Sequence, residues 1–250
     1  MIIDAFTFYN EVDMLKLRLE YLDPIVHYFV IVESTVTHKG EPKKLYFSEH
    51  ESEFQPWMHK IRRVIVEDNP TDSNPWSREN HQRNCITRGL DGIDDDAIIM
   101  ISDVDEIPNL KAIQEQDVSY SLDMITFNYS LDYIQTFERW FGTVVTHKKD
   151  VMEKGGQYFR DKRWKFPYVE FAGWHFSSFG DLNFVTNKLK NFAHCDEEGF
   201  DHDKAEKYVS EGLSHNGKFK LTKTPQHILD TVPEIFKIKY QDKVTNVKQV

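Results

Sequence analysis

The sequence has little cysteine, and its two cysteines, Cys85 and Cys195, lie far apart along the chain. Such a pair offers no metal-binding spacing and favours two buried thiols in a reducing compartment over a fold stabilised by disulfides. Long apolar runs are missing too, because no N-terminal segment reaches the length of a signal peptide or a membrane span. We therefore expect a soluble, cytoplasmic protein without a membrane-spanning segment.

Positive charge is also in deficit, since 41 acidic and 31 basic side chains give the chain a formal net charge of −10. Proteins that bind nucleic acids normally show a basic surface, so we expect no nucleic-acid partner. An anionic substrate would need a metal ion or clustered arginine and lysine side chains to offset this charge. The aromatic share of 14% is high and suits a large core or a stacking surface for flat ligands.

The chain is organised around the segment 97–108, which reads AIIMISDVDEIP. Ala97–Ile101 is a short unbroken apolar run, typical of a strand that is buried on both faces. Three acids, Asp103, Asp105 and Glu106, follow it directly. In an open α/β sheet, ligands bind outside the carboxyl ends of the strands. An Asp-x-Asp pair at that place can hold a divalent cation through oxygen ligands, and the cation can hold a diphosphate.

The Asp-x-Asp pattern alone is weak, because it occurs three times, at Asp94/Asp96, Asp103/Asp105 and Asp201/Asp203. The first pair precedes the apolar run and falls at the wrong end of the strand. The third pair leads into a polar helical pattern, where capping of the helix is the better interpretation. Only the second pair follows a strand, and for it a solvated loop or a local turn cap is the alternative to a metal site.

The first third of the chain has the pattern of a β-α-β unit. Ile2–Tyr9 and Tyr28–Val32 are rich in β-branched and aromatic residues and are predicted strands, and the second ends on Glu33. Val12–Leu22 between them has apolar residues at helical spacing. Two such strands joined by a helix are parallel, which places their carboxyl ends at one edge of the sheet. Ile61–Val66 is predicted to be a third strand.

A polar helix is predicted from a cap at Ser77 to about Leu90, directly before the acidic segment. Arg83 lies one turn beyond Glu79, which allows two interpretations. The face is either solvated, with a Glu79–Arg83 ion pair, or it leans over the strand ends and contacts a phosphate or a base.

The second half of the chain gives weaker signals. Met124–Tyr129 and Tyr168–Ser178 are predicted strands, and a helix is predicted near Lys204–Glu211. The segment 130–170 between the strands mixes aromatic and basic residues, which suits either a sugar- or peptide-binding wall or loosely packed β-structure with a solvated basic face. His175 is either a structural histidine or a metal ligand.

Six segments are together more specific than the acidic pair: Ala5–Glu11, Phe29–Ser34, Thr37–Gly40, Arg78–Arg83, Ile101–Pro108 and Ala172–Phe176. Their order resembles glycosyltransferase family 17 over residues 2–194. The resemblance implies an α/β fold of the GT-A type, which is a Rossmann-like single domain with a central, mostly parallel sheet. It also implies an inverting, metal-dependent enzyme that transfers a sugar, N-acetylglucosamine, from a UDP-sugar to a hydroxyl of a glycan acceptor.

The same resemblance assigns roles to particular residues. Asp103 and Asp105 would bind Mn²⁺ or Mg²⁺, with His175 as a further ligand and His194 as its alternative, and Glu106 would support the loop or a ligand water. The nucleotide-sugar pocket would contain Thr7, Asn10, Glu33, Lys39, Arg78, Arg83, Asp103 and Lys188. For the base that takes the acceptor proton, Glu170 is the first choice and Asp181 the second.

The resemblance also suggests a division of the chain. Residues 1–195 would form the glycosyltransferase domain, with a nucleotide-sugar-binding half (1–110) and an acceptor-binding half (111–195). Residues 196–250 would form a helical tail packed on the same domain. Two other functions use the same features: a metal-dependent nucleotidyltransferase or phosphoester hydrolase, and a non-catalytic carbohydrate-binding protein.

Overall fold

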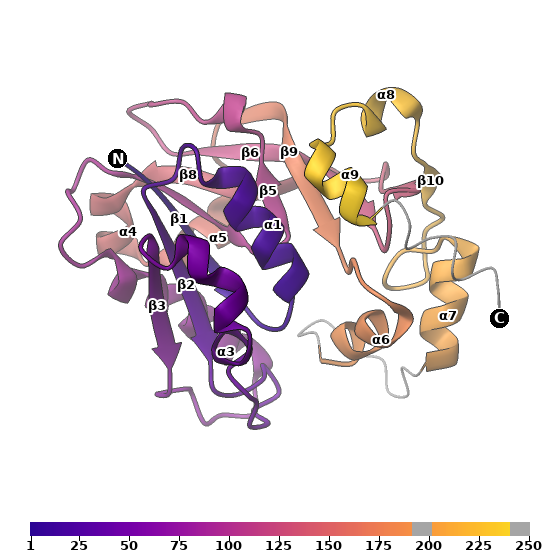
Figure 1. Cartoon of the computed structure of the whole chain (residues 1–250), viewed down its shortest axis with the longest axis horizontal. Helices are drawn as coiled ribbons and strands as arrows, with labels where there is room; N and C mark the ends of the chain where they lie inside the picture. The colour runs from indigo at the N-terminus through magenta and orange to yellow at the C-terminus, as the bar shows by residue number, and fades with distance from the viewer. Residues whose placement is uncertain (192–201, 241–250) are drawn as a thin grey trace. The chain divides into compact units, whose positions relative to one another are not determined.

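The computed structural model describes residues 1–191 and 202–240 (Figure 1). The chain groups into two compact units. Unit 1 comprises Met1–Asp123 and Phe141–Gly173, and unit 2 comprises Met124–Trp140 and Trp174–Val250. These units are defined by contacts within the structure. The expected boundaries at residues 110 and 195 separate parts with different functions, so that division stays a prediction. No helix in the described part of the chain is both long and apolar enough to cross a membrane.

Unit 1 is built on a mixed sheet with the strand order β8-β4-β1-β2-β3. Its strands are β1 (Ile2–Phe8), β2 (Tyr28–Ser34), β3 (Ile61–Val66), β4 (Ile98–Asp103) and β8 (Trp140–His147). The first four run parallel, and β8 is antiparallel to β4. The predicted α/β fold with a central, mostly parallel sheet is therefore confirmed, as is the β-α-β unit with α1 (Val12–Leu22) between β1 and β2.

Alternation along the strands builds the core of unit 1. Ile3 and Ala5 of β1 and Val30 and Val32 of β2 point to one face of the sheet, because successive side chains of a strand point to opposite faces. They are fully buried together with apolar residues of β4 and of the 3₁₀-helix η2 (Cys85–Leu90). This burial fixes the register of the sheet, and the register determines which residues at the strand ends lie next to one another.

The helix before β4 differs from its prediction. α3 spans Pro75–Asn84, and the side chain of Asn74 accepts the N–H of Trp76 at 3.1 Å. The predicted cap at Ser77 is wrong, because Asn74 followed by proline is the stronger start signal. The α-helix also ends earlier than predicted, since the chain continues from Cys85 as η2.

The rest of unit 1 consists of short elements: α2 (Tyr46–Glu49), η1 (Glu51–Trp57), β5 (Glu106–Pro108), η3 (Leu110–Ala112), α4 (Lys148–Lys154) and α5 (Gly156–Lys162). The expectation of loosely packed β-structure over 130–170 is wrong for α4 and α5. Gly155 joins these two helices with a φ of +78°, a conformation that glycine adopts without strain.

Unit 2 contains small strands and four helices among its described residues. The strands are β7 (Tyr133–Ile134), β10 (Thr222–Lys223) and the second part of β6 (Tyr120–Asn128), in the order β10-β7-β6. The helices are α6 (Leu182–Asn191), α7 (His202–Glu211), α8 (Gln226–Leu229) and α9 (Glu234–Tyr240). The predicted helix near 204–211 is confirmed, and Asp201, its expected cap, lies outside the described residues. The predicted strand at Tyr168–Ser178 is β9 (Tyr168–Ser177), which begins in unit 1.

Candidate functional site

Polar side chains meet at the carboxyl ends of the parallel strands of unit 1. Thr7 near the end of β1 is in register with Asp103 of β4 on one side and with Val32 of β2 on the other. Glu33 follows in register with Phe8. The hydroxyl of Thr7 donates to Oδ1 of Asp103 at 3.4 Å. The parallel register thus places Thr7, Glu33 and Asp103, all predicted site residues, at one edge of the sheet.

Asp103 is held between two arginines. Nη2 of Arg83 lies 2.9 Å from Oδ1, and Nη2 of Arg160 lies 2.6 Å from Oδ2. The side chain of Asp103 is 30% exposed, whereas those of Arg83 and Arg160 are 2% and 12% exposed. Two guanidinium groups therefore reach a solvent-accessible carboxylate from the protein side, and together they bring two positive charges to the strand ends.

Arg83 is buried, so the interpretation as a solvated face is wrong for this residue, and its contact with a phosphate or a base stays a prediction. It makes the ion pair with Glu79, at 3.1 Å, and it also reaches over the end of β4 to Asp103. Its Nη1 donates to Oε1 of Gln157 on α5 at 2.5 Å. Nε of Arg83 is buried and has no hydrogen-bond partner among the residues that the structure describes.

Glu106 stabilises the turn after β4, which contains Asp103 and Asp105. Its buried carboxylate accepts the backbone N–H of Asp103 at 2.9 Å and the Nη1 of Arg160 at 2.8 and 3.0 Å. Burial lowers the pKa of Arg160, but the negative charges of Asp103 and Glu106 outweigh it and leave this pKa raised. The guanidinium of Arg160 therefore stays charged at any physiological pH, and the loop-supporting role predicted for Glu106 agrees with its contacts.

Arg18 on α1 holds the backbone of the same turn. Its Nη1 donates to the carbonyl oxygens of Asp103, Val104 and Glu106 at 3.0, 3.1 and 2.9 Å. Its Nη2 donates to the hydroxyl of Ser102 at 2.6 Å. The side chain is fully buried, so the turn that presents Asp103 and Asp105 is fixed from inside the protein.

Asp105, the second predicted metal ligand, lies in the turn between β4 and β5 and is largely buried. Two groups of three potential metal-binding residues lie elsewhere in the described part of the chain, and neither group contains Asp103 or Asp105. The donor chemistry of the pair nevertheless suits a hard divalent cation, because carboxylate oxygens are the ligands that Mn²⁺ and Mg²⁺ prefer.

The carboxylate of Glu33 contacts residues of the segment 43–47. Its buried carboxylate accepts the N–H of Tyr46 at 2.6 Å and that of Phe47 at 3.4 Å, and it pairs with Nζ of Lys43 at 3.3 Å. Burial raises the pKa of Glu33, and the charge of Lys43 counteracts part of this rise. The side chain thus holds the segment 43–47 against the end of β2, and its role in the nucleotide-sugar pocket stays a prediction.

Arg78 ties two loops together. It donates to the carbonyl oxygen of His38 at 3.1 Å and to that of Asp72. Lys39 is exposed on the first of these loops. Asn10, beyond the end of β1, has a buried side-chain oxygen without a hydrogen-bond partner among the described residues. These three predicted pocket residues thus lie on loops that follow the parallel strands or on the helix next to them.

Three predicted site residues belong to unit 2. His175 is buried in β9 and stacks on the ring of Trp140, with centroids 4.7 Å apart and an interplanar angle of 16°. Asp181 accepts the N–H of Phe184 at 2.8 Å, which is the bonding pattern of a helix cap at the start of α6. Lys188 is half-buried on α6.

Two further predicted residues complete this set. Glu170 is exposed on the part of β9 that belongs to unit 1, next to Phe171, which is 70% exposed and has a φ of +50°. His194 lies outside the described residues.

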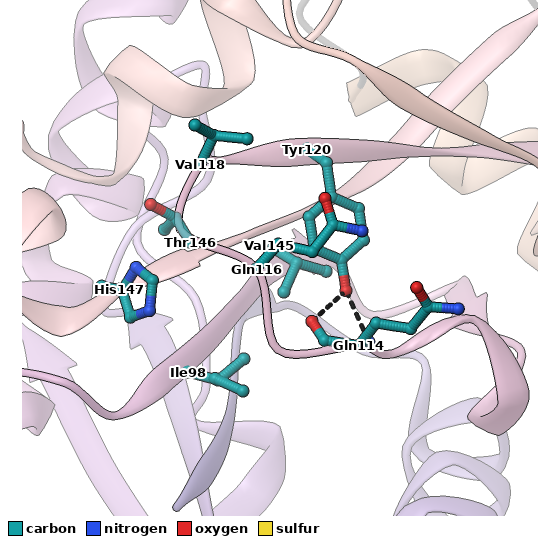
Figure 2. A pocket seen from close by; sticks show the side chains of 8 residues that line it. All are labelled: Ile98, Gln114, Gln116, Val118, Tyr120, Val145, Thr146 and His147. Carbon is teal, nitrogen blue, oxygen red and sulfur yellow. Dashed lines mark hydrogen bonds between the residues drawn. The ribbon is translucent and has the colours of Figure 1, made fainter.

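A shallow hollow lies at the opposite end of β4 (Figure 2). Ile98, which begins β4, and His147, which ends the antiparallel β8, are among its lining residues. The hydroxyl of Tyr120 bridges the backbone N–H and carbonyl of Gln114, both at 2.8 Å. The hollow therefore contains none of the predicted site residues.

The chain has known relatives. A family model described as Glycosyltransferase family 17 matches residues 1–242. The β-1,4-mannosyl-glycoprotein 4-β-N-acetylglucosaminyltransferases of Homo sapiens and Rattus norvegicus are each 30% identical over 115 residues. This match covers 43% of the chain, and only 22% and 21% of the human and rat proteins.

Two solved structures have a weak likeness of fold. An active-site mutant of the galactosyltransferase LgtC has a TM-score of 0.40 and 11% sequence identity, over 92% of this chain and 99% of that one. A mutant of Drosophila β1,4-galactosyltransferase 7 in complex with manganese, UDP-Gal and xylobiose has a TM-score of 0.36 and 11% identity, over 68% of this chain and 64% of that one.

Proposed function

Since the chain belongs to glycosyltransferase family 17, we propose that it transfers N-acetylglucosamine from UDP-N-acetylglucosamine to a hydroxyl of a glycan acceptor, with inversion at the anomeric carbon. The observation that carries the proposal is the position of Asp103, held by Arg83 and Arg160 at the carboxyl ends of β1, β2 and β4. The names of the curated relatives support this donor, although the match spans about a fifth of their length. Membership of the family favours this reaction over phosphoester hydrolysis and over sugar binding without catalysis.

In this proposal the diphosphate of the donor binds at the strand ends of unit 1. Cleavage of the bond between sugar and phosphate leaves UDP with additional negative charge, so cations placed beforehand at this point stabilise the transition state. Arg83 and Arg160 supply such charge with guanidinium groups, which match phosphate oxygens in pairs. Arg83 is held by the half-buried Gln157 and Arg160 by the buried Glu106, and this limits the rearrangement that binding requires.

Asp103 and Asp105 would hold a divalent cation, Mn²⁺ or Mg²⁺, through their carboxylate oxygens. When bound, the ion supplies a Lewis acid that neutralises charge on the departing diphosphate. Arg18 would keep the turn rigid through its bonds to three carbonyl oxygens, so that the two carboxylates keep their spacing. His175 in β9 remains the proposed further ligand of the ion.

An inverting transfer needs a base that takes the proton of the acceptor hydroxyl from the face opposite the leaving group. Glu170 is exposed and is our first candidate for this base. Asp181 is the second, although its bond to the N–H of Phe184 gives it a structural role at α6. A loss of kcat in Glu170→Gln that leaves the donor KM unchanged would favour the first candidate.

The proposal is tested by measuring UDP release from UDP-N-acetylglucosamine with Mn²⁺ and a mixture of glycan acceptors. We expect activity in the native chain, and a loss of at least about a hundredfold in Asp103→Asn and Asp105→Asn. The control is the double variant Asp94→Asn/Asp96→Asn, which changes the same pattern at the other end of β4, where both side chains are exposed.

Different results of this experiment test the reaction, the metal site and the identity of the donor separately. Release of UDP that needs the acceptor and is lost only in the variants at 103 and 105 supports it. Full activity in Asp103→Asn/Asp105→Asn, or equal activity with and without a chelator, would overturn the metal site. Transfer from a different nucleotide sugar only would overturn the donor and leave the site intact.

A further inference from the structure

A second group of potential ligands lies in unit 1, away from the strand ends. His81 of α3 and Cys85 of η2 are four positions apart, and Nε2 of His81 is 3.7 Å from Sγ of Cys85. The same Nε2 lies 3.4 Å from Oδ2 of Asp68, in the loop that follows β3. All three ligand atoms lie within 4.8 Å of one another. One imidazole, one thiol and one carboxylate thus lie close together.

These distances agree with a tetrahedral zinc ion. Zinc binds sulfur at about 2.3 Å and nitrogen or oxygen at about 2.0–2.2 Å, which places neighbouring ligand atoms about 3.4–3.6 Å apart. The observed separations of 3.7 and 3.4 Å around Nε2 of His81 need almost no movement to reach these values.

We propose that Asp68, His81 and Cys85 bind one Zn²⁺ ion, with water in the fourth position. The thiol of Cys85 would lose its proton to solvent, and the thiolate and the carboxylate would offset two of the three positive charges that Zn²⁺ and the guanidinium of Arg88 bring to the site. Sulfur and imidazole ligands select zinc or cobalt over Mn²⁺ and Mg²⁺, which prefer oxygen. The site is therefore chemically distinct from the Asp103/Asp105 pair, and it does not depend on the proposed function.

The surroundings orient all three ligands. Arg88 donates to both oxygens of Asp68, at 2.8 and 2.6 Å, and thereby fixes the direction of the carboxylate. Each carboxylate oxygen has a second lone pair left for an ion. Cys85 is 3% exposed and packs in the main core of unit 1, so its sulfur is fixed as well. Such outer partners are a regular feature of metal sites in proteins.

The position of the ion has a structural consequence. It would join the loop after β3 to α3, the helix that also holds Arg83 beside Asp103. His81 and Cys85 are four positions apart, which is about one helical turn, so the two ligands lie on one side of the chain there. Zinc would thus stabilise the segment where α3 passes into η2.

The test uses the full chain without a histidine tag, treated with a chelator and then titrated with Co²⁺. We expect one equivalent of Co²⁺ to produce a thiolate-to-cobalt charge-transfer band in the near ultraviolet, which Zn²⁺ removes and Mn²⁺ does not. The band should vanish in His81→Gln and weaken in Asp68→Asn. Because Cys85 is a core residue, these two exposed or half-exposed positions carry the test, and Cys85→Ser only supplements it.

Matched variants identify the ligands. His59→Gln changes an exposed histidine of the same unit, and Cys195→Ser removes the other thiol of the sequence. Both should keep the band, and Zn²⁺ should raise the Tm of the native chain but not of His81→Gln. The proposal is overturned if no band forms, if it survives in His81→Gln, or if Cys195→Ser abolishes it. UDP release plays no part in this readout, so a failure of the proposed function leaves the result interpretable.

Discussion

Asp4 of β1 and Arg18 of α1 form an ion pair in which both side chains are fully buried. The guanidinium donates through Nη2 to Oδ1 at 2.6 Å and through Nε to Oδ2 at 2.8 Å. Its remaining donors reach the turn after β4. An acidic residue inside the first strand is thus linked, through one arginine, to the backbone that presents Asp103.

Loss of either partner of this pair should destabilise the fold strongly. Arg18→Met leaves the carboxylate of Asp4 buried without its charged partner, and it also removes the Arg18 donor from three carbonyl oxygens of the turn. We expect the free energy of unfolding to fall by about 3–5 kcal/mol, measured by urea denaturation. Lys16→Met is the matched control, because Lys16 lies on the same helix and its one ion pair among the described residues is an exposed contact with Glu53 at 3.7 Å. An equal loss in both variants would contradict this prediction.

Replacement of Arg160 by lysine should separate charge from geometry. A lysine keeps the positive charge but presents one nitrogen in place of the two, fixed in one plane, with which Arg160 contacts Asp103 and Glu106. We expect kcat/KM for the donor to fall about 10- to 100-fold in Arg160→Lys, which corresponds to the loss of one hydrogen bond to a charged group. Lys165→Met, at an exposed position beyond α5, should leave kcat/KM unchanged. Wild-type kinetics in Arg160→Lys would show that charge alone is sufficient.

Glu33 should make stability depend on pH in a defined direction. Burial raises its pKa in the folded protein, so the folded state binds the proton more tightly than the unfolded chain does. Its contribution to stability is therefore complete below the unfolded pKa and is lost as pH rises through the folded pKa. Relative to the native chain, Glu33→Gln should gain stability as pH rises through this acidic window. Urea denaturation of both proteins across the window measures the difference, and exposed Glu41→Gln should show no such trend.

The main elements of unit 1 could be predicted because their signals are local. Apolar runs gave β1, β2 and β4 to within two residues, and the helical spacing of apolar side chains gave α1. The order of strand and acid likewise singled out Asp103 among three similar pairs. The prediction that failed also concerned a local signal. The helix α3 is capped by Asn74 and begins earlier than the predicted cap at Ser77 would allow.

The partners of Asp103 could not be predicted in the same way. Arg160 reaches it across 57 positions, and Arg18 reaches the turn across 85, so no spacing rule connects them. Asp4 was a usable signal, because a carboxylate within a buried strand requires a partner. The convergence of Asp68 on His81 and Cys85 likewise depends on how the end of β3 meets α3, and a search for paired cysteines overlooks it.

Two glycines of unit 1 offer a controlled test of the loop next to Arg78. Gly40 has a φ of +88° and Gly92 a φ of +69°, so alanine at either position is strained by about 1–2 kcal/mol. They differ in their surroundings: a Cβ on Gly40 would lie 3.0 Å from Nη2 of Arg78, whereas one on Gly92 would meet nothing within 4 Å.

Gly40→Ala should therefore displace the guanidinium that joins His38 to Asp72, and Gly92→Ala should not. We expect similar losses of unfolding free energy in the two variants, but a raised donor KM only in Gly40→Ala, because Arg78 is a proposed pocket residue. Urea denaturation and initial rates of UDP release measure the two quantities separately. If both variants keep the native KM, the loop at 38–40 lies outside the donor site. If both raise it equally, the effect comes from general destabilisation and not from Arg78.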